Sequence, residues 1–186
     1  MNIAFVFVFV VWIGSELVLS WRMRAGKGES GHRDSRTLAV IYAATVSATT
    51  IATAVALFSE FPIWRMPETR YFGMLIIISG MALRIWSMIM LGRFFTYNVA
   101  LRDGHELIRS GPYRVLRHPS YTGLLFSFFG YGVALNNWIS LVAVFIPVFL
   151  AFSRRIAVEE TVLSEHFGDL YTEYKRRTWR LIPLVY

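Results

Sequence analysis

Residues 72–91 read FGMLIIISGMALRIWSMIML, an apolar run of twenty residues interrupted by one charge, Arg84. A helix needs roughly 20 apolar residues to cross a hydrocarbon core about 30 Å thick, so this run predicts a transmembrane helix. Two earlier runs, Asn2–Trp21 and Leu38–Phe58, have the same length and character. The sequence therefore predicts three spanning helices within residues 1–91.

The second half of the chain holds two shorter apolar runs, Tyr121–Leu135 and Trp138–Phe152. The pair Asn136-Asn137 between them is typical of a tight turn. Each run is short for a full crossing, so we expect a hairpin of two short or tilted helices, with a re-entrant hairpin as the alternative. The predicted fold class is all-α: one integral membrane domain, residues 1–186, with five transmembrane helices, a cytoplasmic loop and an amphipathic C-terminal helix.

The composition supports a membrane protein, because 55% of the residues are apolar and only 17% are charged. There is no cysteine, which excludes disulfides and thiolate metal sites. With five crossings, sixteen of the nineteen Lys and Arg residues fall on one side of the membrane and two on the other. The positive-inside rule then puts the N-terminus outside and the C-terminus in the cytoplasm. The net charge of +7 is therefore interpreted as a topology signal and not as a nucleic-acid surface.

Two ionisable residues, Glu16 and Arg84, lie inside apolar runs at similar expected depths. Such groups are costly in a membrane unless they are paired or face a polar cavity. We expect a structural salt bridge between them, with a polar cavity wall as the alternative. Residues 26–31, GKGESG, match the dinucleotide-binding glycine pattern, but they follow a membrane helix and not a strand, so they predict a flexible loop.

Two polar segments, residues 92–120 and 154–180, flank the predicted hairpin on the cytoplasmic side. We expect them to fold against each other and to carry the chemistry. Pro119 suits the first position of a helix, whose free backbone donors favour an anionic group; a plain helix cap with a basic cluster is the alternative. Arg155 and Glu159 share a helical face, either as a surface ion pair or as a cation and an anion for a zwitterionic ligand.

The polar segments resemble the isoprenylcysteine carboxyl methyltransferase family in its short prokaryotic form. The resemblance covers about residues 92–186, the predicted methyltransferase core, and rests on these motifs: Gly92-Arg93-Phe94-Phe95, His105-Glu106-Leu107-Ile108, Gly111-Pro112-Tyr113, Arg117-His118-Pro119-Ser120-Tyr121-Thr122-Gly123, Glu159-Glu160, Phe167-Gly168, Tyr171, Tyr174 and Arg180-Leu181-Ile182-Pro183. It implies methyl transfer from S-adenosylmethionine to a carboxylate, in a membrane-embedded pocket that the C-terminal segment closes.

The resemblance also implies roles for individual residues. Its substrate-facing arginine corresponds to Arg155, and it implies no metal ligand. Its cofactor-binding positions correspond to His105, Glu106, Leu107, Ile108, Tyr113, His118, Pro119, Ser120, Tyr121 and Glu159, with a looser match at Asn98. Ile108 stands where the family often has valine.

The chemistry of the methyl acceptor separates the possible functions. A carboxylate is already ionised at neutral pH and needs no general base. An amine acceptor, as in a phospholipid or amine N-methyltransferase, would need one among His118, Tyr121 and Glu160. A sterol-type reductase and a non-enzymatic scaffold or transporter are more distant alternatives. The expected partners are a lipophilic substrate and membrane lipids. The expected location is the inner membrane of a prokaryotic cell. The sequence leaves the oligomeric state open.

Overall fold

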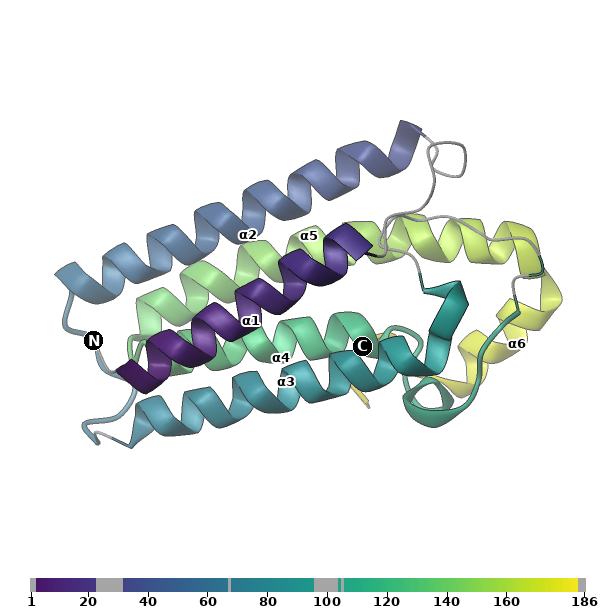
Figure 1. Cartoon of the computed structure of the whole chain (residues 1–186). Helices are drawn as coiled ribbons and strands as arrows, with labels where there is room; N and C mark the ends of the chain where they lie inside the picture. Colours follow the sequence, from purple (N-terminus) through teal and green to yellow (C-terminus); the bar gives the residue numbers. More distant parts are fainter. Residues whose placement is uncertain (1–2, 23–31, 67, 96–103, 105, 184–186) are drawn as a thin grey trace.

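The computed structural model describes residues 3–22, 32–66, 68–95, 104 and 106–183, and this part of the chain is helical, without a β-strand. Successive long helices run in alternate directions and form an elongated bundle (Figure 1). They are α1 (Ile3–Arg22), α2 (His32–Phe58), α3 (Thr69–Leu91), α4 (Pro119–Ala134) and α5 (Trp138–Phe167). Two short 3-10 helices, η1 (Gly92–Phe94) and η2 (Gly111–Arg114), and α6 (Asp169–Arg177) lie toward one end, called the polar end below.

Four helices of the described chain are long and apolar enough to cross a membrane, which makes this an integral membrane protein. They comprise Ile3–Trp21, Thr37–Phe58, Thr69–Phe94 and Trp138–Phe167. The three predicted N-terminal spans are therefore confirmed. Helix α4 has only 16 residues. It packs between α3 and α5, while α2 packs on α5 and α1 on α3.

The predicted turn between α4 and α5 is also present. Asn136 has a positive φ of 51°, a conformation that asparagine tolerates better than most residues. Asn137 caps α5, because its side-chain oxygen accepts a hydrogen bond from the backbone N–H of Ser140 at 3.1 Å. The same side chain donates to the carbonyl of Ser59 at 3.0 Å, which ties the turn to the end of α2.

The prediction for the C-terminal part was wrong in one respect. Helix α5 does not end near Phe152 but continues to Phe167 and has 30 residues in all, so only α4 is a short arm. The charged stretch 154–180 is accordingly not one amphipathic helix: it begins as the end of α5, breaks at Gly168 and continues as α6. Gly168 has a φ of 53°, which ends α5. Charge marks where the apolar surface ends, whereas the helix persists until a residue breaks it.

Helices α3 and α4 approach each other so closely that their backbones touch. A Cβ atom built on Gly80 would lie 2.5 Å from the carbonyl oxygen of Gly123, and one built on Gly123 would lie 2.6 Å from that of Gly80. Gly73 and Gly130 make an equivalent contact one heptad away. Small residues at this spacing are typical of membrane helix pairs. The close approach brings Arg84, one turn beyond Gly80, against the start of α4.

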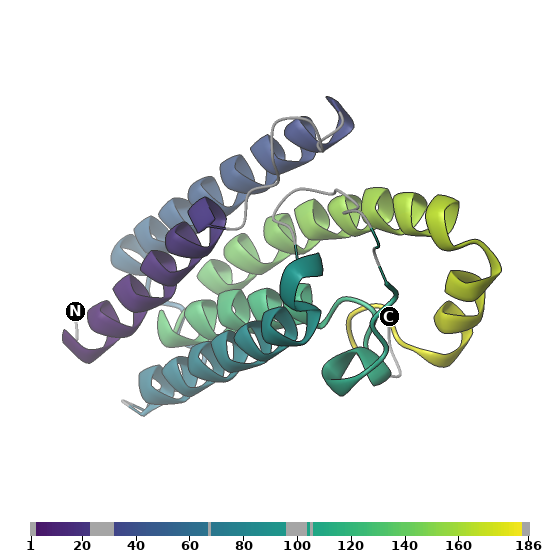
Figure 2. The same ribbon diagram turned by 45° about the vertical axis from the view of Figure 1, so that its right-hand side comes forward.

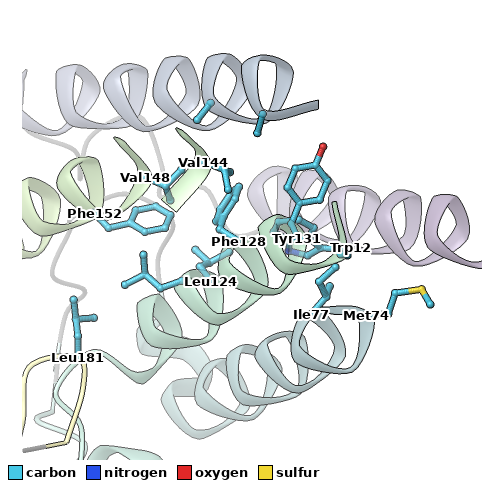
Figure 3. Packing of buried hydrophobic residues seen from close by; sticks show 14 of the residues in the cluster. Trp12, Met74, Ile77, Leu124, Phe128, Tyr131, Val144, Val148, Phe152 and Leu181 are labelled. Carbon is cyan, nitrogen blue, oxygen red and sulfur yellow. The ribbon is translucent and has the colours of Figure 1, made fainter. Parts of the chain in front are cut away.

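An aromatic cluster at the centre of the bundle joins α1 to the hairpin (Figure 3). The ring centroids of Trp12 and Phe128 lie 4.8 Å apart in an edge-on arrangement, and Tyr131 stacks on Phe5 at 5.9 Å. Edge-on and offset ring pairs add to the stabilisation from burial. Leu181, which is fully buried, brings the C-terminal segment into the same cluster.

Candidate functional site

The end of α5, α6 and residues 106–118 come together at the polar end (Figure 2). Side chains from these elements line a cavity. Counted with the open space at its mouth, it occupies about 1150 Å³. Its walls come from five helices and two connecting segments: Leu38, Ile41, Arg84, Leu91, Phe94, Phe95, Glu106, Leu107, Ile108, Tyr113, Arg117, His118, Ser120, Tyr121, Leu124, Phe152, Arg155, Glu159, Val162, Leu163, Tyr171 and Tyr174. It is thus a hollow lined by both apolar and charged side chains, as ligand sites commonly are.

The two polar segments meet at this cavity, as predicted. The backbone N–H of Arg117 donates to the carbonyl of Trp179 at 2.8 Å, and that of Trp179 donates to the carbonyl of Val115 at 2.9 Å. The hydroxyl of Thr122 donates to the carbonyl of Leu181 at 2.8 Å. The C-terminal segment is therefore fixed to the entry of α4 by its backbone.

Glu160 joins these segments through its side chain. Its carboxylate accepts from Nε of Arg117 at 3.0 Å and lies 2.8 Å from a guanidinium nitrogen of Arg180. Nε2 of His118 lies 3.2 Å from the same carboxylate. Arg117 also donates to the carbonyls of Lys175 and Thr178. Glu160 does not line the cavity, so its visible contacts are structural.

Arg155 lies inside the protein and not on its surface. The residue is only 2% exposed, so the alternative of an ion pair on the surface does not describe it. Its Nε donates to the hydroxyl of Tyr121 at 3.1 Å, and its Nη1 donates to the hydroxyl of Thr37 at 2.8 Å. These two hydrogen bonds orient the guanidinium group beside Tyr121 and Thr37.

Glu159 lies one helical turn further along α5 and also lines the cavity. Its side chain is 30% exposed, and its carboxylate lies 3.8 Å from Nδ1 of His118. The same hollow therefore presents a buried cation and a more exposed anion. A wall with both charges can receive a cationic group and an anionic group.

The predicted ion pair between Glu16 and Arg84 is confirmed. Nε and Nη2 of Arg84 lie 2.5 and 2.7 Å from the two carboxylate oxygens of Glu16, a bidentate contact. Nη1 of Arg84 donates to the hydroxyl of Ser120 at 2.9 Å. Arg84 also lines the cavity, so the pair and the polar wall, weighed as alternatives, coexist.

Tyrosines close the cavity near α6. The hydroxyl of Tyr174 donates to the carbonyl of Tyr113 at 2.7 Å and so ties α6 to η2. Burial, and next the carboxylate of Glu159, raise the pKa of Tyr113 far above its usual range. The phenol of Tyr113 therefore remains protonated at neutral pH and can donate a hydrogen bond.

The structure brings most of the predicted site residues to this one cavity. Those in its wall are Glu106, Leu107, Ile108, Tyr113, His118, Ser120, Tyr121, Arg155 and Glu159. Pro119 is fully buried as the first residue of α4 and is not part of the wall. Asn98 and His105 lie outside the described residues.

Sequence reasoning missed several wall residues. Leu38 and Ile41 come from α2, and nothing in their sequence marks them as different from other apolar residues of that helix. Val162 lies three residues beyond Glu159, so helical spacing could have found it. Leu38 and Ile41 reach the cavity because α2 packs on α5, and a local sequence pattern does not encode that packing.

This geometry defines a class of protein. It is a helical membrane protein with a buried arginine and a carboxylate in one cavity at its polar end. Residues 69–170, more than half of the chain, match the family model described as phospholipid methyltransferase. The chain belongs to this family. The resemblance to isoprenylcysteine carboxyl methyltransferases that the sequence predicted is confirmed by the relatives.

Protein-S-isoprenylcysteine O-methyltransferase B of Arabidopsis thaliana is 40% identical over 116 residues, which are 61% of this chain and 59% of the relative. The Schizosaccharomyces pombe protein-S-isoprenylcysteine O-methyltransferase is 34% identical over 57% of this chain and 46% of its own length. The solved structure of a eukaryotic intramembrane Ras methyltransferase, isoprenylcysteine carboxyl methyltransferase, has a TM-score of 0.63 at 26% identity, over 77% of this chain and 52% of that one. The chain thus spans less than two thirds of the length of these relatives.

Proposed function

We propose that this protein transfers a methyl group from S-adenosylmethionine to the carboxylate of a lipophilic substrate that resembles a prenylcysteine. The observation that carries the proposal is the pair on α5: buried Arg155 and more exposed Glu159, one turn apart, in the wall of one cavity. Relatives that bear the name protein-S-isoprenylcysteine O-methyltransferase support the acceptor.

The residues around Glu159 fit the methyl donor. A carboxylate suits its ammonium group, and the aromatic faces of Tyr113 and Tyr121 suit a sulfonium cation. Residues 106–108, His118 and Ser120 complete this part of the wall. When bound, the donor supplies an electrophilic methyl group. Pro119 contributes by starting α4, and the binding roles of Asn98 and His105 remain predictions.

The residues around Arg155 fit the acceptor. A carboxylate with an ordinary pKa near 4 is ionised at neutral pH, so it can accept a methyl group without a general base. Arg155 would hold this carboxylate, oriented by its bonds to Tyr121 and Thr37. The apolar wall, which includes Leu38 and Phe152, would receive the hydrocarbon part and exclude water.

The same proposal includes the topology. We infer five crossings, with α4 as a short span of about 24 Å at 1.5 Å per residue. The N-terminus would face outward, while the polar end and the C-terminus would face the cytoplasm, where the methyl donor is found. Residues 1–186 then form one membrane domain whose methyltransferase core is residues 92–186. The inner membrane of a prokaryotic cell remains the predicted location.

An amine acceptor is the second candidate, because the family model that matches is described as phospholipid methyltransferase. An amine must lose a proton, so this function needs a free base near the acceptor. Of the candidate bases, Glu160 is held by Arg117 and Arg180 outside the cavity wall. His118 and Tyr121 do line the cavity, so the preference for a carboxylate acceptor rests on the names of the relatives.

Titration calorimetry of the detergent-purified protein with S-adenosylhomocysteine tests the donor site. We expect binding by the wild type and affinity at least about tenfold weaker in Glu159→Gln, since a hydrogen bond to a charged group contributes about 1.5–3 kcal/mol. Glu165→Gln is the matched control, because Glu165 is exposed on the same helix and does not line the cavity. A wild-type protein that is folded and gives no binding heat overturns the proposed donor.

A second assay identifies the acceptor. The protein is incubated with radiolabelled methyl donor and either prenylcysteine analogues or membrane lipids. Base-labile label indicates an ester, and base-stable label indicates an amine. We expect base-labile label on the prenylcysteine analogues, and base-stable label on lipids would favour the second candidate.

A further inference from the structure

Helix α6 presents two buried tyrosines to the cavity, and their hydroxyl groups differ. Tyr174 is 5% exposed, and its hydroxyl is used within the protein, as a donor to the carbonyl of Tyr113 at 2.7 Å. Tyr171 is 1% exposed, and its hydroxyl has no hydrogen-bond partner among the residues that the structure describes. Both side chains line the cavity (Figure 2 shows the position of α6).

The ring of Tyr171 is nevertheless held firmly. Its centroid lies 6.0 Å from that of Tyr174, and the ammonium of Lys175 lies 5.2 Å from its centre, within the range of a cation–π contact. A buried hydroxyl without a partner costs free energy, and most such groups in folded proteins are satisfied. Tyr171 lines the cavity, so a ligand bound there is a group that can supply the missing partner of this buried hydroxyl.

The hydroxyl of Tyr171 acts as a donor. Burial, and then the carboxylates of Glu160 and Glu159, raise the pKa of Tyr171 far above its usual range. The phenol therefore keeps its proton at neutral pH. Its partner must then be an acceptor on the ligand.

The position of Tyr171 indicates which acceptor group of the ligand its hydroxyl contacts. If Glu159 receives the ammonium group of an S-adenosyl ligand, the carboxylate on the same carbon atom lies a few ångströms from it. Donors beside Glu159 are then well placed for this carboxylate, and Arg117 lines the same wall as Tyr171. A ligand carboxylate accepts hydrogen bonds more strongly than the neutral ribose or adenine atoms.

We propose that the hydroxyl of Tyr171 donates a hydrogen bond to the α-carboxylate of the bound S-adenosyl ligand, whereas the hydroxyl of Tyr174 serves the fold. This assignment rests on the proposed function. It makes Tyr171, a residue of α6, a ligand-binding residue in addition to the cofactor-binding positions that the resemblance implied.

The test compares Tyr171→Phe with Tyr174→Phe, a matched pair on one helix that each lose a single oxygen atom. Binding of S-adenosylhomocysteine is measured by calorimetry, and the thermal midpoint is measured without ligand. We expect Tyr171→Phe to bind about tenfold more weakly, with an unchanged or higher midpoint, because no bond within the described protein is lost. Tyr174→Phe should lower the midpoint.

The decarboxylated analogue of S-adenosylhomocysteine keeps the amine and the adenosine. It tests whether the α-carboxylate is the group that accepts the hydrogen bond from Tyr171. It should bind the wild type and Tyr171→Phe equally. An equal loss for both ligands would place the hydroxyl against another group and overturn the assignment. A lowered midpoint in Tyr171→Phe, or unchanged affinity for S-adenosylhomocysteine, would also overturn it. If the wild type does not bind S-adenosylhomocysteine, the proposed function itself fails.

Discussion

The ion pair between Glu16 and Arg84 allows a quantitative test of how α1 is attached to the site. The two side chains are 17% and 6% exposed and make two short contacts, at 2.5 and 2.7 Å. We consider the variants Glu16→Leu, Arg84→Met and the double variant. Each replaces a charged group by an apolar one of similar size, so the changes in packing are small.

The expected magnitudes follow from what each variant leaves behind. Breaking a buried pair by removing one partner costs about 3–5 kcal/mol, and the partial exposure of Glu16 places Glu16→Leu near the lower end, about 3 kcal/mol. Arg84→Met leaves the carboxylate of Glu16, which is 17% exposed and can be partly hydrated, so we expect a smaller loss of about 2 kcal/mol. The double variant leaves no unpaired charge but loses the hydrogen bond from Arg84 to Ser120, so it should cost about 2 kcal/mol. The coupling free energy is then about 3 kcal/mol.

The measurement is the free energy of unfolding in mixed micelles, obtained from detergent titrations followed by circular dichroism. The exposed pair Glu173–Arg177 on α6 has a contact of the same length, 2.5 Å, with side chains that are 52% and 76% exposed, and provides the control cycle. Its coupling should be near zero, because solvent screens it. If the losses of Glu16→Leu and Arg84→Met simply add in the double variant, the reasoning about this pair is refuted.

Two further predictions concern the geometry of the site. Gly123→Ala would place a Cβ atom 2.6 Å from the carbonyl oxygen of Gly80. We therefore expect a loss of about 1–3 kcal/mol in the free energy of unfolding and weaker binding of S-adenosylhomocysteine. In the control variant Gly14→Ala the new Cβ atom has nothing within 4 Å, so this change should be harmless or stabilising. Glu160→Gln removes the carboxylate that holds Arg117, so we expect faster tryptic cleavage at the basic residues of the C-terminal segment, and an unchanged cleavage rate would contradict its structural role.

The sequence was sufficient for the helices of the N-terminal half and for the turn at Asn136, because hydropathy and turn preference act locally. It was also sufficient for the pairing of Glu16 with Arg84, since depth along a helix follows from its rise per residue. It misjudged the end of α5, because the loss of apolar character at Arg154 is not a helix stop. The actual stop is the positive φ of Gly168.

Most of the site residues that the motifs indicated lie together in the cavity wall, although they come from segments separated by tens of residues. Their convergence depends on the contact between the backbones of α3 and α4 and on the pairing of Arg117 with Trp179. Both contacts join residues far apart in the chain. Spacing along one segment does not predict such contacts.

The amino-acid sequence by itself determined that this chain is a helical membrane protein and which residue types gather at its polar end, because these properties sum over neighbouring residues. Only the tertiary structure decided that Arg155 is buried and that α2 forms part of the cavity wall. It also distinguished Tyr171 from Tyr174, two tyrosines that a sequence pattern treats alike. The physical reason is that burial and hydrogen-bond satisfaction are set by groups from other helices.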